Sequence, residues 1–259
     1  MTAAELLPAC WLALALIFAA LWLIQCDTHD ASHVDVGWAA GLGLTAAACA
    51  VLLPGAPGRR ALVGAMGAAW SLRLAAHLYF DRVRGKPEDG RYAALRVSWG
   101  ARADRNFFWF FQVQALLDVV LALSFLAACV RPGPLGAADA AGAAVWLMAV
   151  SGEAAADSQL AAFRADRANK GRTCRTGLWA WSRHPNYFFE WLHWLAYAAM
   201  APSDWRAWVA PALMLYFLLR VTGIPATEAQ ALRSRGDDYR DYQKSTSMFV
   251  PWFPKRGAA

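Results

Sequence analysis

The stretch that decides the fold is TCRTGLWAWSRHPNYFFEWLHW, residues 173–194. It begins as a polar segment and continues into an apolar helix, and its polar cluster consists of Arg183, His184, Asn186, Glu190 and His193. Polar side chains that enter a bilayer need a partner or a water-filled cavity, so a cluster of this kind indicates a functional site in a membrane protein. Asn186, Glu190 and His193 recur at i, i+4 and i+7, which predicts that they share one face of the helix.

The composition of the whole chain agrees with a membrane protein. Of the 259 residues, 58% are hydrophobic and 14 are Trp, and the mean hydropathy is positive. The formal net charge of +6 does not indicate nucleic-acid binding. The Lys and Arg residues lie in short segments between apolar runs, as they do in the cytoplasmic loops of membrane proteins.

The spacing of cysteine, histidine and glutamate does not favour a metal site. The five cysteines are scattered and form no C-x-x-C pair. Glu190 and His193 form an E-x-x-H pair of the kind found in di-iron bundles, but such bundles need a second pair. The sequence has no second pair, and we therefore expect no metal.

A hydrocarbon core of about 30 Å needs roughly 20 apolar residues in a helix. Seven stretches approach this length, at approximately 4–25, 36–54, 61–80, 107–130, 137–156, 186–201 and 205–223. We predict an all-α polytopic membrane protein with seven transmembrane helices, folded as one integral-membrane domain over residues 1–259.

Lys and Arg residues are concentrated in alternate connections between these spans. They gather between spans three and four, between spans five and six, and after span seven, whereas the opposite side holds only Arg59, Arg60, Arg131 and Arg206. Because the side richer in Lys and Arg is normally cytoplasmic, we predict that the N-terminus lies outside and the C-terminus in the cytoplasm.

Two further segments carry candidate site residues. Asp35, in CDTHDASHVDVGW, stands where the second span enters the membrane, so it is either an N-cap of that helix or a site residue. Glu153, Asp157 and Arg164 lie at i, i+4 and i+11 on the extension of the fifth span, and therefore on one helical face. We expect this face to line a cavity filled with solvent.

The residue types suit the binding of a large anionic cofactor better than covalent catalysis. The chain has no Ser-His-Asp order, no nucleophilic cysteine in a recognisable setting and no G-x-G-x-x-G motif. By contrast, the loop RANKGRTCRTG carries Lys170, Arg172 and Arg175, and basic side chains of this kind bind phosphates through charge-assisted hydrogen bonds.

Five segments of the chain resemble a known family when they are taken together. They are EDGRY (88–92), ADSQLAAFR (156–164), GLWAWSRHPNYFFEW (177–191), TGIP (222–225) and YRDYQKSTSMFVPWFP (239–254). The set resembles the membrane-embedded steroid 5α-reductase superfamily, and more narrowly its bacterial branch. The resemblance covers about the last two thirds of the chain.

This resemblance implies a bundle that binds NADPH from the cytoplasmic side of a bacterial inner membrane. The hydride would pass to the carbon–carbon double bond of an enone lipid, typically the 4-ene of a 3-oxo-steroid, which gives the 5α product. Residues 150–259 would form most of the cofactor half. The residues that resemble family cofactor contacts are Asp157, Arg164, Asn186, Glu190 and Arg220. The further candidates for cofactor binding are Lys170, Arg172, Arg183, His184, Tyr187, Glu228 and Tyr239.

The resemblance also implies catalytic residues. Hydride addition to an enone builds negative charge on the carbonyl oxygen, so a hydrogen-bond donor must lie there. The family uses a tyrosine on the third span with a carboxylate on the second; Tyr79, in HLYFDR, resembles that tyrosine and Asp35 is the candidate carboxylate. Glu153 is a further candidate for the donor. The alternative for Tyr79 is an interfacial tyrosine of the aromatic belt.

Two other functions stay open at the level of sequence. The RHPNY segment with a terminal Y-x-x-Y also resembles membrane methyltransferases that bind S-adenosylmethionine, and a sterol- or lipid-binding protein without catalysis is the third possibility. We favour the reductase because the Arg-rich loop before Arg183 fits a dinucleotide with an extra phosphate. We expect a monomer whose partners are the enone substrate and membrane lipids.

Overall fold

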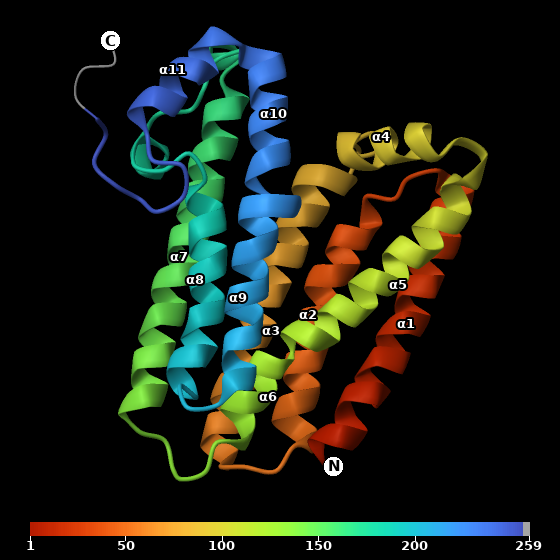
Figure 1. The fold of residues 1–259 in the computed structure, drawn as a ribbon, viewed down its shortest axis with the longest axis vertical. Helices are drawn as coiled ribbons and strands as arrows, with labels where there is room; N and C mark the ends of the chain where they lie inside the picture. The colour runs from red at the N-terminus through yellow and green to blue at the C-terminus, as the bar shows by residue number, and fades with distance from the viewer. Residues whose placement is uncertain (256–259) are drawn as a thin grey trace. The chain divides into compact units, whose positions relative to one another are not determined.

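In the computed structural model, which describes residues 1–255, every regular element of secondary structure is helical. The chain divides into two compact units (Figure 1). Unit 1 comprises Met1–Asp139 and Ala201–Ala210, and unit 2 comprises Ala140–Met200 and the chain from Pro211 onward. The single domain expected over residues 1–259 stays a prediction.

Among the described residues, five helical segments are long and apolar enough to cross a membrane: Ala3–Thr28, His33–Leu52, Pro57–Val83, Gly90–Val130 and Trp205–Arg235. They correspond to the first four predicted spans and the last one, and they indicate an integral membrane protein. The other two predicted spans are also helical, but α8 has only 16 residues and α7 is rich in alanine. The number of seven spans and the orientation of the termini stay predictions.

The helices of unit 1 pack through both small and aromatic side chains. Its elements are α1 (Ala3–Thr28), α2 (His33–Leu52), α3 (Pro57–Leu78), η1 (Tyr79–Val83), α4 (Gly90–Trp99), η2 (Gly100–Arg102), α5 (Ala103–Leu121), α6 (Leu123–Val130) and η5 (Trp205–Trp208). Between α2 and α3 the backbones come very close, because a Cβ added to Gly43 would overlap Ser71 and one added to Gly67 would overlap Ala46. Small residues permit this approach, which drives helix association where lipid is as apolar as the side chains.

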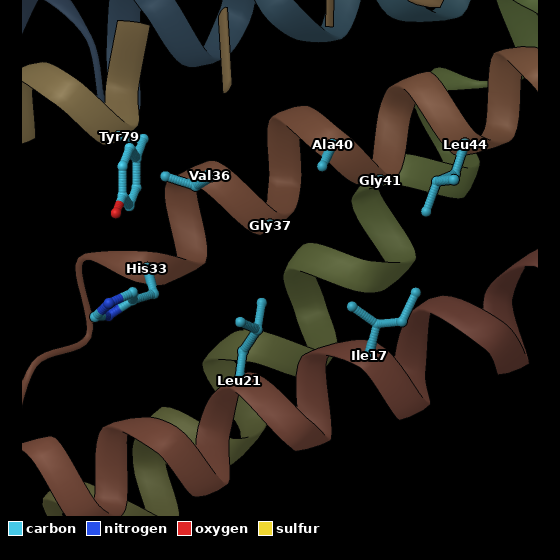
Figure 2. Close-up of a pocket in the computed structure, with 9 residues that line it drawn as sticks. All are labelled: Ile17, Leu21, His33, Val36, Gly37, Ala40, Gly41, Leu44 and Tyr79. Atoms are coloured by element: carbon cyan, nitrogen blue, oxygen red, sulfur yellow. The ribbon is translucent and has the colours of Figure 1, made fainter. Parts of the chain in front are cut away.

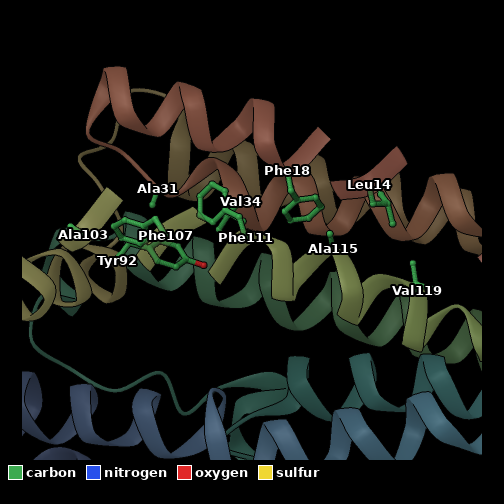
Figure 3. Close-up of a cluster of buried hydrophobic side chains, with 10 residues drawn as sticks. All are labelled: Leu14, Phe18, Ala31, Val34, Tyr92, Ala103, Phe107, Phe111, Ala115 and Val119. Atoms are coloured by element: carbon green, nitrogen blue, oxygen red, sulfur yellow. The ribbon is translucent and has the colours of Figure 1, made fainter. Parts of the chain in front are cut away.

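An aromatic cluster holds α5 and α4 against the first two helices (Figure 3). Phe107 and Phe111 of α5 are fully buried and lie in this cluster with Leu14 and Phe18 of α1. Tyr92 of α4 meets the ring of Phe107 edge to face, with centroids 6.4 Å apart. The cluster therefore fixes the position of Tyr92, whose hydroxyl donates a hydrogen bond to Asp35.

Unit 2 is built from helices that follow one another with short connections. Its elements are α7 (Ala137–Ala165, from Ala140 onward), η3 (Arg167–Asn169), η4 (Gly177–Ala180), α8 (Pro185–Met200), α9 (Val209–Tyr216, from Pro211 onward), η6 (Phe217–Val221), α10 (Ile224–Arg235) and α11 (Asp237–Ser245). Gly152 of α7 makes room for the ring of Phe189 on α8. The indole N–H of Trp191 donates to the carbonyl of Pro211 at 3.0 Å and links α8 to α9.

The C-terminal segment of unit 2 is docked on the residues that precede α8. The amide of Arg183 donates to the Ser247 carbonyl at 2.8 Å, and the Ser182 hydroxyl donates to the Phe249 carbonyl at 2.7 Å. Tyr242 is buried and its hydroxyl donates to the carbonyl of Ser182 at 3.1 Å. These bonds tie the end of the chain to the start of the polar cluster.

Candidate functional site

In unit 1, Asp35 is the centre of a polar cluster in the first turn of α2. Its carboxylate accepts hydrogen bonds from the Tyr92 hydroxyl at 2.5 Å and from the guanidinium groups of Arg91 at 2.6 Å and Arg82 at 3.2 Å. The Asp35 side chain is 16% exposed, so these charge-assisted bonds lie in a partly dry environment. The N-cap position of α2 is Ser32 rather than Asp35. The contacts engage both oxygens of Asp35.

The EDGRY segment holds the connection before α2 in place. Glu88 accepts a hydrogen bond from the amide of Ala31 at 2.9 Å and from the Arg96 guanidinium at 2.8 Å. The amide of Asp89 donates to the Ser32 hydroxyl at 2.8 Å. With Arg91 and Tyr92 bonded to Asp35, four residues of this five-residue segment thus contact the same short connection and the helix that follows it.

An apolar pocket of about 290 Å³ lies beside α2 in the same unit (Figure 2). Its lining consists of Ile17, Leu21, His33, Val36, Gly37, Ala40, Gly41, Leu44 and Tyr79. Of these side chains, those of His33 and Tyr79 are polar, and Figure 2 shows the hydroxyl end of Tyr79 pointing toward the turn of α2 that carries His33. Asp35 does not belong to this lining. The pocket therefore suits an apolar ligand with one polar end.

Tyr79 begins a π-helical turn, η1, at the end of α3. Single π-helical turns inside longer helices occur often at functional sites. The Tyr79 side chain is 42% exposed, and its hydroxyl makes no hydrogen bond with the described residues. The hydroxyl is thus free to donate to a ligand in the pocket. Arg220 lies in a second π-helical turn, η6, and is exposed.

In unit 2, Glu228 of α10 joins several of the predicted cofactor residues. Its carboxylate accepts hydrogen bonds from the Arg183 guanidinium at 2.7 Å, the Gln243 amide at 2.8 Å and the Tyr239 hydroxyl at 3.3 Å. The Nε2 atom of His184 lies 3.3 Å from the same carboxylate. Arg183 and Glu228 are only 10% and 15% exposed, so this network connects the residues just before α8 with α10 and α11, largely away from solvent.

The network also sets the state of its titratable side chains. Burial lowers the pKa of His184 below its usual value, although the hydrogen bond with Glu228 opposes this effect. Burial, assisted by the charge of Glu228, raises the pKa of Tyr239. The ring of Tyr187 stacks on that of His184 with centroids 5.4 Å apart, and the Tyr187 hydroxyl lies 3.1 Å from the hydroxyl of Thr227. The contacts with Tyr187 and Glu228 therefore fix the orientation of the His184 ring.

The predicted pair Asp157 and Asn186 comes together between α7 and α8. The Asn186 amide donates to the Asp157 carboxylate at 3.3 Å, and both side chains are half-buried. Glu190, one turn further along α8, is also half-buried, whereas Glu153 is 3% exposed on α7. Arg164 and Lys170 are exposed beyond this region. Tyr79 and Asp35 belong to unit 1, and Glu153 belongs to unit 2.

A polar pocket of about 360 Å³ lies on the loop between α7 and α8. Its lining consists of Phe163, Asn169, Arg172, Thr173, Arg175, Thr176 and Asp238. Arg172 is exposed, and the guanidinium of Arg175 is held by the Asp238 carboxylate at 2.9 Å. The hydroxyl oxygen of Thr173 is buried without a hydrogen-bond partner. The carboxylate of Asp238 offsets the charge of Arg175, so Arg172 and the Thr173 hydroxyl are the lining groups left to bind a phosphate.

Sequence reasoning missed several residues of these sites. Arg91 and Tyr92 were noticed only as part of a motif, yet they bind Asp35. Gln243 could have been found, since it lies at i+4 from Tyr239 on α11 and shares its face. His33 lines the apolar pocket, which forms between segments distant in the chain, so no local pattern identified it.

Comparison with known protein families places most of this chain in one of them. The family described as "Protein of unknown function (DUF1295)" matches residues 21–246. The chain belongs to the DUF1295 family. The matched part of this DUF1295 protein contains Asp35, Tyr79, Glu228 and Tyr239, so both polar clusters lie within it. The chain matches no curated protein and no solved structure.

Proposed function

We propose that this DUF1295 protein is a membrane reductase of the steroid 5α-reductase type, which uses NADPH to reduce the carbon–carbon double bond of an enone lipid. The substrate class we favour is the 4-ene of a 3-oxo-steroid, reduced to the 5α product. The observation that carries the proposal is the apolar pocket of unit 1 with the free Tyr79 hydroxyl at its polar end. We further propose that the protein acts as a monomer in a bacterial inner membrane, with the cofactor half facing the cytoplasm.

In this proposal, unit 1 stabilises the negative charge that develops on the carbonyl oxygen of the substrate. NADPH, when bound, supplies the hydride that adds to the β-carbon of the enone. The electron pair of the double bond would then move toward the carbonyl oxygen, where the Tyr79 hydroxyl would donate a hydrogen bond, and the α-carbon would take a proton from water as the carbonyl re-forms. Asp35 supports this arrangement through Arg82, which lies in the same π-helical turn as Tyr79.

The residues of unit 2 fit the anionic part of such a cofactor. Arg172 offers forked donors to a phosphate, and the buried Thr173 hydroxyl offers a further bond. Lys170 lies on the same loop and is exposed. The three bases Lys170, Arg172 and Arg175 together exceed what a pyrophosphate needs, which favours a dinucleotide with an additional 2′-phosphate. Asn186 and Glu190 would serve amide and ribose groups, while the Glu228 network fixes the helix that carries them.

A binding titration on purified protein tests the proposal against its alternatives. We expect saturable binding of NADPH that is tighter than that of NADH, and no binding of S-adenosylmethionine. Binding of S-adenosylmethionine alone would indicate a methyltransferase, and binding of neither would indicate a lipid-binding protein. Reduction of testosterone or progesterone by the NADPH-loaded protein is the second measurement.

Two substitutions test the assignment of the cofactor half. Asn186→Ala and Glu190→Ala should abolish NADPH binding while the protein still inserts and purifies as a monodisperse species. The matched control is Arg167→Ala, because Arg167 is exposed on the neighbouring loop and does not line the polar pocket. Normal cofactor binding by both variants would show that this stretch is structural and would overturn our assignment.

A further inference from the structure

We infer that His33 is a second substrate-binding residue of the apolar pocket, and that the substrate lies along α2 with its carbonyl at the His33 end. The inference rests on the proposed function and adds to it a residue and an orientation. It is carried by the lining of the pocket, by the engagement of Asp35 elsewhere and by the position of the His33 ring.

The pocket has polar side chains at one place only. His33 and Tyr79 supply them, and the other lining side chains are aliphatic or absent. A carbonyl that left water for the aliphatic part would lose its hydrogen bonds without replacement, which is costly. A ligand with one carbonyl is therefore oriented by the pocket, with the carbonyl at the His33 and Tyr79 end.

Asp35 is not available as the second polar group for this carbonyl. Its two oxygens accept bonds from Tyr92, Arg91 and Arg82, and it does not line the pocket. His33 stands two residues earlier in the chain and does line the pocket. Among the lining residues on α2, His33 is therefore the polar side chain that is available to the carbonyl.

The His33 ring is oriented so that one nitrogen can serve a ligand. Its Nδ1 atom lies 3.4 Å from the carbonyl oxygen of Asp30, a long contact that places Nδ1 on the backbone side of the ring. Nε2 has no hydrogen-bond partner among the described residues. In the tautomer that carries its proton on Nε2 this nitrogen is a donor, and Nε2–H then donates to the substrate carbonyl beside the Tyr79 hydroxyl.

The dimensions of the pocket indicate the shape of the ligand. The lining on α2 extends from His33 to Leu44, eleven residues, which at 1.5 Å per residue is about 16 Å. Ile17 and Leu44 are 39% and 56% exposed, so in a bilayer this side of the pocket opens to lipid. The ligand class is an elongated, membrane-soluble molecule with an enone at one end.

The test measures binding of testosterone to the purified protein without NADPH, through the ultraviolet absorption band of the enone. A hydrogen bond to the carbonyl shifts this band to longer wavelength. We expect the shift with wild-type protein, and its loss in His33→Leu together with about tenfold weaker binding or more. His33→Gln, whose amide nitrogen replaces Nε2, should keep much of the shift, whereas His33→Asn should not. His29→Asn is the control, because His29 is exposed and does not line the pocket.

The outcomes separate this inference from the proposed function. An unchanged shift and affinity in His33→Leu, or no binding of testosterone to wild type, overturns the inference, even where turnover with NADPH is observed. A His33-dependent shift in a protein that does not bind NADPH supports the inference and removes the reductase. If His33→Leu does not purify as a monodisperse species, His33→Gln and His33→Asn are compared instead. A band shift kept in His33→Gln and lost in His33→Asn supports the inference, and equal shifts in the two variants overturn it.

Discussion

Replacing Glu228 by glutamine tests whether the network of unit 2 is a structural support or a cofactor contact. The wild-type carboxylate makes two short hydrogen bonds, to Arg183 at 2.7 Å and to Gln243 at 2.8 Å. A glutamine keeps the size of the side chain but retains one acceptor oxygen, and its amide group faces donors. We therefore expect the variant to lose about one charge-assisted bond and the neutralisation of the Arg183 charge.

The expected cost follows from these contacts. A hydrogen bond to a charged group contributes about 1.5–3 kcal/mol, and because the two partners are only 10% and 15% exposed, solvent screens it little. We expect a loss of about 2–3 kcal/mol in the free energy of unfolding. For a chain of this size, 1 kcal/mol shifts Tm by roughly 2–4 °C, so Tm should fall by about 4–12 °C.

The assay is thermal unfolding of the detergent-purified protein, with and without NADPH. Arg240→Ala is the matched control: its ion pair with Asp237 has side chains that are 62% and 91% exposed, and such pairs contribute about 0–1 kcal/mol. A Tm of Glu228→Gln within the range of this control would refute the structural reasoning. Loss of NADPH binding at an unchanged Tm would identify Glu228 as a direct cofactor contact instead.

The other predictions concern pH, catalysis, cofactor choice and helix packing. Burial lowers the pKa of His184 in the folded protein, so as the pH falls below about 6.5 this histidine is protonated in the unfolded state first. Tm should therefore decrease on acidification, and it should decrease less in His184→Gln, which cannot take up this proton. Tyr79→Phe should reduce turnover of a 3-oxo-4-ene steroid by about 10²-fold or more without changing NADPH affinity, whereas turnover within about threefold of wild type would return Tyr79 to the aromatic belt. Arg172→Gln should weaken binding of NADPH but not of NADH by about tenfold, and Arg167→Gln should alter neither; equal losses for both cofactors contradict the 2′-phosphate assignment. Gly67→Val overpacks the contact of α3 with α2 and should cost about 1–3 kcal/mol in unfolding measurements; a wild-type Tm would contradict the close packing.

Local patterns were sufficient to predict the helices of this protein. Long apolar runs and helical periodicity depend on residues within a few turns of one another, and all seven predicted spans are helical. The same local logic placed Asn186 and Glu190 on one face of α8. It was weaker where an apolar run is short, and α8 has only 16 residues.

The partners of the charged residues were decided by tertiary structure. Any of several arginines could pair with Asp35 by composition, and the packing of α4 selected Arg91 and Tyr92, which follow it by 56 and 57 residues. Similarly, the apolar pocket forms where α1, α2 and η1 meet, and its polar end combines Tyr79 of η1 with His33 of α2. Hydropathy and spacing are properties of one segment, whereas ion pairs and cavities form between segments distant in the chain, so the sequence by itself determined the helices and only their packing decided the sites.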